Sequence, residues 1–246
     1  MDTPDHLLQA RLADVEQRIA AACQRAGRSR DDVQLVAVTK YTSLAHVADA
    51  IALGQLELGE SRPQQLIQRA QVFPPSVSWH LIGHLQRNKV EQVLPWTRWI
   101  HSVDSLRLMQ RIDEVAERLQ RRPNVLLEVN LSGEQAKDGL SVDELRANWK
   151  QFAAFQQVNL GGLMTMVPLD ATPSEIRGFF RQLRELRDEL NQQKLLAVPM
   201  SHLSMGMSGD FEIAIEEGAT MIRLGSTLFE GLDSPPDQDS PSGTEA

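Results

Sequence analysis

Short runs rich in β-branched residues alternate along this chain with longer segments in which apolar residues recur every three or four positions. The short runs predict buried strands, and the periodic segments predict amphipathic helices between them. We expect eight strands, at residues 33–40, 56–60, 79–84, 99–105, 124–131, 159–166, 200–205 and 220–226.

An additional helix precedes the first strand. Its apolar residues alternate in steps of four and three, which places them in one stripe: Leu8, Leu12, Val15, Ile19 and Ala22. Such a stripe is typical of a helix that covers a core, and Gly27 is suited to end it.

Alternation of strands and helices predicts an α/β fold with a parallel sheet. Eight repeats in about 200 residues favour closure into a single (β/α)₈ TIM barrel with an extra N-terminal helix. A doubly wound open sheet is the alternative, but the first strand is followed by Thr-Lys-Tyr-Thr-Ser and by no glycine-rich phosphate loop. We expect the barrel to occupy residues 1–232, and we expect residues 233–246, which are polar and rich in proline and acids, to form a disordered acidic tail.

Composition narrows the class of protein. A net charge of −8 argues against nucleic-acid binding, which needs a basic surface. A single cysteine excludes an intramolecular disulfide and fits a reducing compartment. The charged N-terminal segment does not resemble a signal peptide, and no apolar run reaches the roughly 18 residues that a membrane helix needs. We therefore expect a soluble cytoplasmic protein without membrane contacts.

Lys40 ends the first predicted strand, at the end of the barrel where active sites of this fold lie. If Val36 and Val38 face the barrel interior, alternation points Lys40 into the mouth, where a desolvated amine can attack a carbonyl. Position alone favours a lysine that extends to solvent, because most lysines are surface residues.

Residues near the C-terminus change this picture. Arg223 lies on the eighth strand, beside the first in a closed barrel, and an inward arginine needs a partner. The loop after strand seven and the start of a short helix after strand eight form the recurrent phosphate site of this fold. Here they offer small residues and accessible backbone N–H groups: Ser204, Gly206, Ser208, Gly209, Gly225 and Ser226. Ser208 also suits the cap of the following helix.

Lysine, arginine and a phosphate-binding loop together match the needs of pyridoxal 5′-phosphate (PLP). This cofactor needs an amine for its Schiff base, a partner for its pyridine nitrogen and donors for its phosphate. An arginine facing that nitrogen would keep it unprotonated, so the ring would be a weaker electron sink than one paired with a carboxylate.

Several segments in order resemble the pyridoxal phosphate homeostasis proteins, also called the YggS or PROSC family. The resemblance runs from about Leu7 to Gly231. It is carried by LVAVTK, LGE-x-RPQQL, WHLIGHLQRNK, HSVDS, EVNLSGEQAKDGL, GLMTM, HLSMGMSGDFEIAIEEGAT and RLGSTLFEG. Such a likeness implies a PLP-binding barrel related to the alanine racemase N-terminal domain, which functions in vitamin B6 homeostasis.

The resemblance also implies roles for single residues. Lys40 would carry PLP as an internal aldimine, Arg223 would face the ring nitrogen, and the phosphate contacts would come from Ser208, Gly225 and Ser226. Ser61 stands where the family usually has asparagine, so this shorter side chain offers fewer donors for the contact expected there. With Ser204, these residues form the predicted cofactor site.

Two functions remain open for such a site. A PLP enzyme of the racemase or decarboxylase type needs a second proton-transfer group opposite the lysine. In alanine racemase that group is a tyrosine from another domain, whereas the one tyrosine here, Tyr41, is adjacent to Lys40 and expected to point the opposite way. We therefore expect a non-catalytic PLP carrier, monomeric, with apo PLP enzymes as recipients.

Two further alternatives depend on other features. A barrel that binds a sugar phosphate would use the phosphate loop but leave Lys40 unexplained. His80 and His84 share a face if their segment stays extended, but no clear third ligand accompanies them, so we expect no metal.

Overall fold

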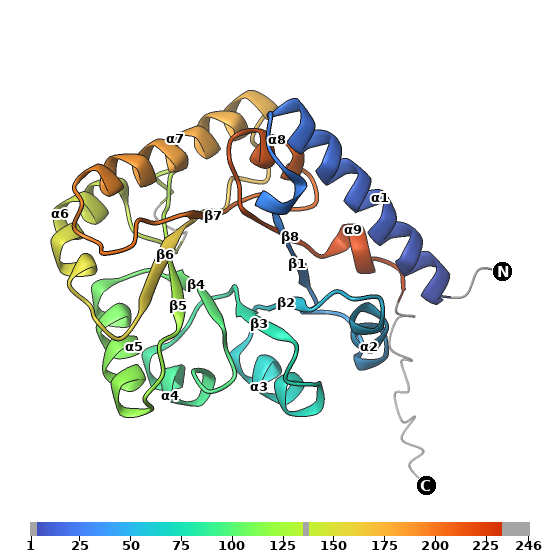
Figure 1. Cartoon of the computed structure of the whole chain (residues 1–246), viewed down its shortest axis with the longest axis horizontal. Coiled ribbons are helices and arrows are strands. Elements are labelled where there is room, and N and C mark those ends of the chain that lie inside the picture. The colour runs from blue at the N-terminus through green and yellow to red at the C-terminus, as the bar shows by residue number, and fades with distance from the viewer. Residues whose placement is uncertain (1–3, 135–137, 233–246) are drawn as a thin grey trace, which may run out of the picture.

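Eight parallel strands form a closed barrel in the computed structural model, which describes residues 4–134 and 138–232. Each strand pairs with its neighbour in sequence, and the last pairs with the first (Figure 1). The strands are β1 (Gln34–Val38), β2 (Glu57–Glu60), β3 (Ser78–Leu81), β4 (Trp99–Val103), β5 (Asn124–Glu128), β6 (Asn159–Met164), β7 (His202–Ser204) and β8 (Met221–Leu224). The predicted barrel is confirmed, with every strand shorter than predicted because the strand ends continue as loops. The predicted acidic tail, residues 233–246, lies outside the described residues.

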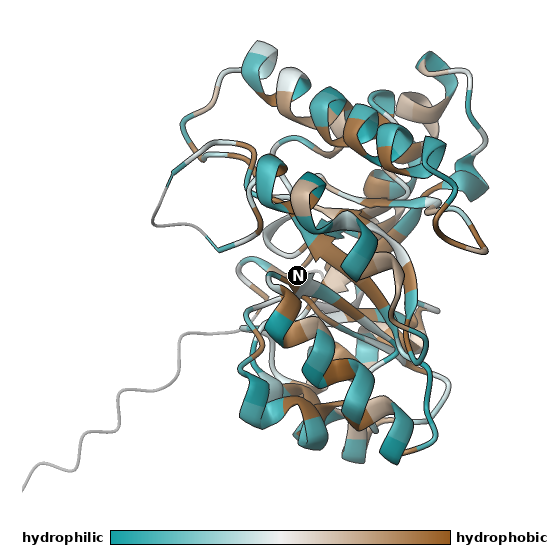
Figure 2. Ribbon diagram, turned by 90° about the vertical axis from the view of Figure 1, so that its left-hand side faces the viewer, coloured by the Kyte–Doolittle hydropathy of each residue, from teal (hydrophilic) through white to brown (hydrophobic). Residues whose placement is uncertain are grey.

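Helices surround the barrel and cover its outer face (Figure 1). They are α1 (Pro4–Arg25), α2 (Leu44–Ala52), α3 (Pro63–Val72), α4 (Val90–Val93), α5 (Leu106–Arg118), α6 (Val142–Ala153), α7 (Pro173–Gln192), α8 (Phe211–Glu216) and α9 (Ser226–Phe229). Two short 3₁₀ helices, Arg30–Asp32 and Arg87–Lys89, precede β1 and α4. Figure 2 shows polar residues along the outward sides of the helices and apolar residues toward the strands. None of the described helices is long and apolar enough to cross a membrane.

Two apolar clusters show which way the strand residues face. The larger cluster joins helix residues to one set of strand positions, such as Leu35, Ala37, Val125 and Leu127, so it lies between barrel and helices. The smaller cluster contains only strand residues and therefore fills the barrel interior: Trp99, Leu126, Met164 and Met221. Alternation along β5 then places Glu128 on the interior face with Leu126.

Helix α1 packs along α8 and α9 (Figure 1). Its predicted stripe is confirmed: Leu8, Val15, Ile19 and Ala22 are fully buried, and Leu12 packs against them. The helix ends before Gly27, whose φ of +65° is one that a residue with a Cβ rarely adopts. The side chain of Arg11 donates to the carbonyl oxygens of Leu228 and Glu230, which fixes the N-terminal helix to the end of the barrel chain.

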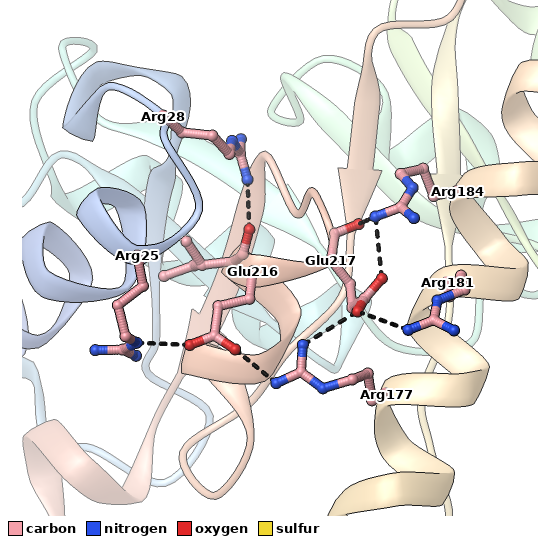
Figure 3. A network of polar contacts seen from close by, with 8 residues as sticks. Arg25, Arg28, Arg177, Arg181, Arg184, Glu216 and Glu217 are labelled. Atoms are coloured by element: carbon pink, nitrogen blue, oxygen red, sulfur yellow. Dashed lines mark hydrogen bonds and ion pairs between the residues drawn. The ribbon is translucent and has the colours of Figure 1, made fainter.

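Two glutamates at the end of α8 join α1 to α7 (Figure 3). Glu216 accepts hydrogen bonds from Arg25 and Arg177. The buried carboxylate of Glu217 accepts from three arginines on successive turns of α7: Arg177, Arg181 and Arg184. Because α8 connects the loop after β7 to β8, these ion pairs hold the segment that carries several predicted cofactor residues.

Candidate functional site

Lys40 lies in a turn just beyond the carboxyl end of β1. The strand ends at Val38, and the turn is closed by a hydrogen bond of 2.9 Å from the Thr42 N–H to the Thr39 carbonyl oxygen. The Lys40 side chain is exposed, and its Nζ lies 5.0 Å from the ring centroid of Tyr41. The prediction that Tyr41 points away from Lys40 is therefore wrong, since the alternation of a strand ends where the strand ends.

The buried side chain of Arg69 stabilises this turn. Arg69 of α3 donates to the carbonyl oxygen of Thr39 at 2.7 Å, and also to the Thr42 carbonyl and the Glu60 carboxylate. The Thr39 hydroxyl donates to the same carboxylate. Burial raises the pKa of Glu60, although Thr39 and Arg69 oppose this effect. These contacts fix the backbone on both sides of Lys40, a role that sequence reasoning missed.

Arg223 lies inside the barrel on β8 and is only 4% exposed. Its Nη1 donates to the Ser204 hydroxyl at 2.6 Å, and its Nη2 donates to the Thr165 carbonyl oxygen at 3.0 Å. Burial lowers its pKa to about 10, while the charges of Glu128 and Asp210 act in the opposite direction. The guanidinium therefore remains charged at neutral pH.

Ser204 contacts Arg223 and His101 inside the barrel. Its side chain is fully buried, accepts a hydrogen bond from Arg223 and lies 2.8 Å from His101 Nδ1. The hydroxyl thus supports Arg223 in the structure, and its predicted contact with the cofactor stays a prediction. The reason for the contact with Arg223 is alternation, because Ser204 is the last residue of β7 and faces the barrel interior.

Ser208, Gly225 and Ser226 come together where the β7–α8 loop meets the start of α9. The Ser208 hydroxyl accepts from the Thr227 N–H at 3.3 Å. The expected capping of α8 by Ser208 is wrong, because Asp210 occupies the N-cap position. Among the described residues, none accepts a hydrogen bond from the backbone N–H groups of Ser208 and Ser226. Two backbone donors are thus available at a point where an anion could bind.

Gly225 brings this segment against the end of β1. A Cβ added to Gly225 would lie 3.3 Å from the carbonyl oxygen of Val38, two residues before Lys40. Ser61 directly follows β2 on the other side of β1 and is partly exposed. The carboxyl ends of β8, β1 and β2 thus bring Gly225, Lys40 and Ser61 to one side of the barrel mouth.

Glu128 is a second residue that sequence reasoning missed. It is the last residue of β5, faces the interior and is 5% exposed. Burial raises its pKa to about 7, the charges of Asp138 and Asp104 add to this effect, and the charge of Arg223 opposes it. Its place at a strand end, like that of Lys40, is the signal that could have identified it.

His80 and His84 do not form one site. His80 is buried inside the barrel, with Nε2 2.7 Å from Glu57 and Nδ1 2.8 Å from His101. His84 lies beyond β3, half exposed, with Nδ1 3.2 Å from Asp104. The segment stops being extended at Leu81, so the expected shared face does not exist.

Comparison with known proteins adds relatives over most of the chain. The alanine racemase N-terminal domain family matches residues 11–233. The pyridoxal phosphate homeostasis protein of Aquifex aeolicus is 39% identical over 220 residues, which cover 89% of this chain and 96% of that protein. The protein of the same name from Escherichia coli K12 is 33% identical, over 90% of this chain and 95% of its own length.

Solved structures of other proteins are similar to this chain in fold. PipY of Synechococcus elongatus, solved with PLP bound, is 38% identical with a TM-score of 0.80, over 90% of this chain and 99% of its own. An alanine racemase of Clostridium difficile is similar in fold alone, at 16% identity and a TM-score of 0.67. This chain covers 62% of that racemase, compared with 99% of PipY.

Proposed function

This chain belongs to the pyridoxal phosphate homeostasis protein family, and on that premise we propose that it binds PLP through the amine of Lys40. PLP supplies a reactive aldehyde carbon, which condenses with amines. The proposed unit is the barrel, residues 1–232, acting as a carrier in vitamin B6 homeostasis without robust catalysis.

The observation that carries this proposal is the pairing of β1 with β8. Val36 lies opposite Arg223 in that pair, so the chain beyond Val36 and the guanidinium share one part of the barrel mouth. The turn with Lys40 then follows the strand that pairs with the Arg223 strand. It also lies near Gly225, at the segment where the backbone N–H groups of Ser208 and Ser226 have no acceptor among the described residues. An amine, a cation and phosphate donors are what PLP requires, and a sugar phosphate would leave the amine without a role.

We assign the contacts residue by residue. Arg223 faces the ring nitrogen, and two of its five N–H groups are occupied by Ser204 and Thr165, so others remain available. Ser208, Gly225 and Ser226 hold the phosphate through backbone and hydroxyl groups. Ser61 contributes from the neighbouring strand end.

Exposure of Lys40 favours a carrier over an enzyme. The amine and the Tyr41 ring next to it are open to solvent, with Tyr41 79% exposed. Competing amines and water therefore reach the attachment point, which suits release of the cofactor. We extend the proposal to a monomer that passes PLP to apo PLP enzymes.

Glu128 supports the alternative, a PLP-dependent amino-acid enzyme of the racemase or decarboxylase type. A carboxyl group with a pKa of about 7 at the barrel mouth is suited to general acid–base catalysis. A carrier needs no such group for chemistry, so assays of turnover distinguish the two functions.

Incubation with PLP, borohydride reduction and peptide mapping test the attachment. We expect the modified residue to be Lys40, with loss of labelling in Lys40→Ala and normal labelling in Lys150→Ala, a control on α6. Protein that takes up no PLP, or that is modified at another lysine, would overturn the attachment.

Racemisation, decarboxylation and transamination of common amino acids test the carrier assignment. We expect rates no higher than those of free PLP. Turnover well above free PLP that disappears in both Lys40→Ala and Glu128→Gln would establish the enzyme instead.

A further inference from the structure

An unbroken chain of polar side chains crosses the interior of the barrel from Glu57 to Arg223. Glu57 Oε2 lies 2.7 Å from His80 Nε2, and His80 Nδ1 lies 2.8 Å from His101 Nε2. His101 Nδ1 lies 2.8 Å from the Ser204 hydroxyl, which accepts from Arg223 at 2.6 Å. The chain passes from β2 through β3 and β4, crosses the barrel to β7 and ends on β8.

Its two ends lie at different depths of the barrel. Glu57 is the first residue of β2, at the amino end, and its side chain is 29% exposed. Arg223 is the third residue of the four in β8, toward the carboxyl end. His80, His101 and Ser204 between them are fully buried. These hydrogen bonds thus connect the partly exposed Glu57 at the amino end of the barrel to the proposed cofactor pocket at the carboxyl end.

The charges at the two ends determine the direction of every hydrogen bond. Glu57 is ionised: burial opposes this, but the hydrogen bond and charge of His80 lower its pKa overall. Burial lowers the pKa of both His80 and His101, so both rings are neutral at neutral pH, with one N–H each.

His80 must therefore place its N–H on Nε2, facing the Glu57 carboxylate, which only accepts. Its Nδ1 is then an acceptor, so His101 donates from Nε2, and His101 Nδ1 accepts from the Ser204 hydroxyl. Arg223 donates to the remaining lone pair of Ser204. In each of these hydrogen bonds the donor is thus on the Arg223 side and the acceptor is on the Glu57 side.

Burial gives this arrangement an energetic consequence. Both nitrogens of both buried rings have a partner, as a polar network in a barrel interior requires. Within the described part of the chain, no carboxylate lies within salt-bridge distance of Arg223; the acids that face it, Glu128 and Asp210, act only through charge. The chain is therefore the hydrogen-bonded route by which Arg223 reaches a carboxylate.

We propose that Glu57, His80 and His101 are positioning residues of the cofactor site, which hold the Ser204 hydroxyl as an acceptor and so orient the charged Arg223 toward the ring nitrogen. This inference rests on the proposed function. It predicts that a change at Glu57, at the opposite end of the barrel from Lys40, alters the bound cofactor.

The first test needs no cofactor. Nitrogen-15 NMR of the PLP-free protein, labelled at histidine, reports which ring nitrogen carries the proton. We expect the Nε2–H form for both His80 and His101 at neutral pH. An Nδ1–H form of His101 would reverse the chain and overturn the proposal, whether or not PLP binds.

The second test measures PLP affinity and the visible absorbance of the bound cofactor in a double-mutant cycle. Glu57→Gln should weaken PLP binding about threefold or more and shift the absorbance, whereas Glu91→Gln, which removes the same charge on the surface, should do neither. His101→Phe should have a similar effect, and Glu57→Gln should add nothing to it. His101→Gln, which keeps one donor and one acceptor, should restore binding in part.

The outcomes separate the two proposals. Wild-type protein that binds no PLP refutes the proposed function. The NMR result would still decide the direction of the hydrogen bonds between Arg223 and Glu57. Normal PLP binding and an unchanged spectrum in Glu57→Gln refute the positioning role and leave the carrier function intact. The Glu57→Gln comparison also decides the matter if His101→Phe fails to fold.

Discussion

Glu128 should make the protein less stable as the pH rises. This carboxyl group is 5% exposed, and its pKa is raised from 4.5 to about 7 by burial and by the charges of Asp138 and Asp104. In the folded state it therefore holds its proton at pH values where the unfolded chain has released it. The contribution of Glu128 to stability is fully present below about pH 4.5 and is lost as the pH rises to about 7.

The magnitude follows from the shift. A difference of this size corresponds to about 3 kcal/mol, since each pKa unit is worth about 1.4 kcal/mol. Glu128→Gln has nearly the same shape and never ionises. Relative to wild type, the variant should gain about 3 kcal/mol of unfolding free energy between pH 4.5 and pH 8, with most of the gain complete by pH 7.

Urea unfolding of the PLP-free protein at intervals between pH 4.5 and pH 8 measures this difference. Glu91→Gln is the matched control, because Glu91 is exposed and pairs with Arg118, which lowers its pKa. Glu91 is thus ionised in both states above pH 5, and its variant should run parallel to wild type. Parallel curves for Glu128→Gln and wild type would refute the reasoning.

Two further predictions concern the segment that carries the β7–β8 residues. Gly206→Ala should destabilise the fold by about 2 kcal/mol or more, because φ is +96° and the new Cβ would lie 2.6 Å from that of Ala214. The control Gly178→Ala, in open space on α7, should be neutral or stabilising. Equal urea midpoints for the two variants would contradict this prediction. Glu217→Gln should cost about 3 kcal/mol in urea unfolding at pH 7, since it leaves three arginines without their buried acceptor. Burial raises the pKa of Glu217, but the three arginines lower it overall. The stability lost in Glu217→Gln should therefore shrink as the pH falls below about 4.5. A loss that does not change with pH would count against the ion pairs.

Local sequence patterns were sufficient for the order of elements. Short, mostly apolar strands and helices with one apolar stripe differ in period, and both periods can be read along the chain. The sequence also singled out Lys40 and Arg223 as candidate cofactor residues, because polar residues at strand ends stand out among apolar neighbours. The predicted strand ends were less accurate. Because β1 stops before Lys40, strand alternation does not separate Lys40 from Tyr41, and the two side chains lie next to each other.

The interior chain could be anticipated only in part. Glu57 and His80 are polar residues on short apolar strands, which marks them as unusual. Their partners follow from closure of the barrel: His101 meets Ser204 across 103 residues of sequence. Nothing local distinguishes a serine that binds phosphate from one that supports Arg223.

The sequence by itself determined the strand and helix order, the amphipathic N-terminal helix, and a lysine and an arginine on the first and last strands, which a closed barrel makes neighbours. These features depend on residue type and on periodicity over a few positions, where backbone geometry dictates the outcome. Tertiary structure alone decided how Arg69 holds the turn around Lys40, why Glu128 keeps its proton to about pH 7, and which groups contact Arg223. Those properties depend on burial and on contacts between distant strands, and both exist only after the barrel has closed.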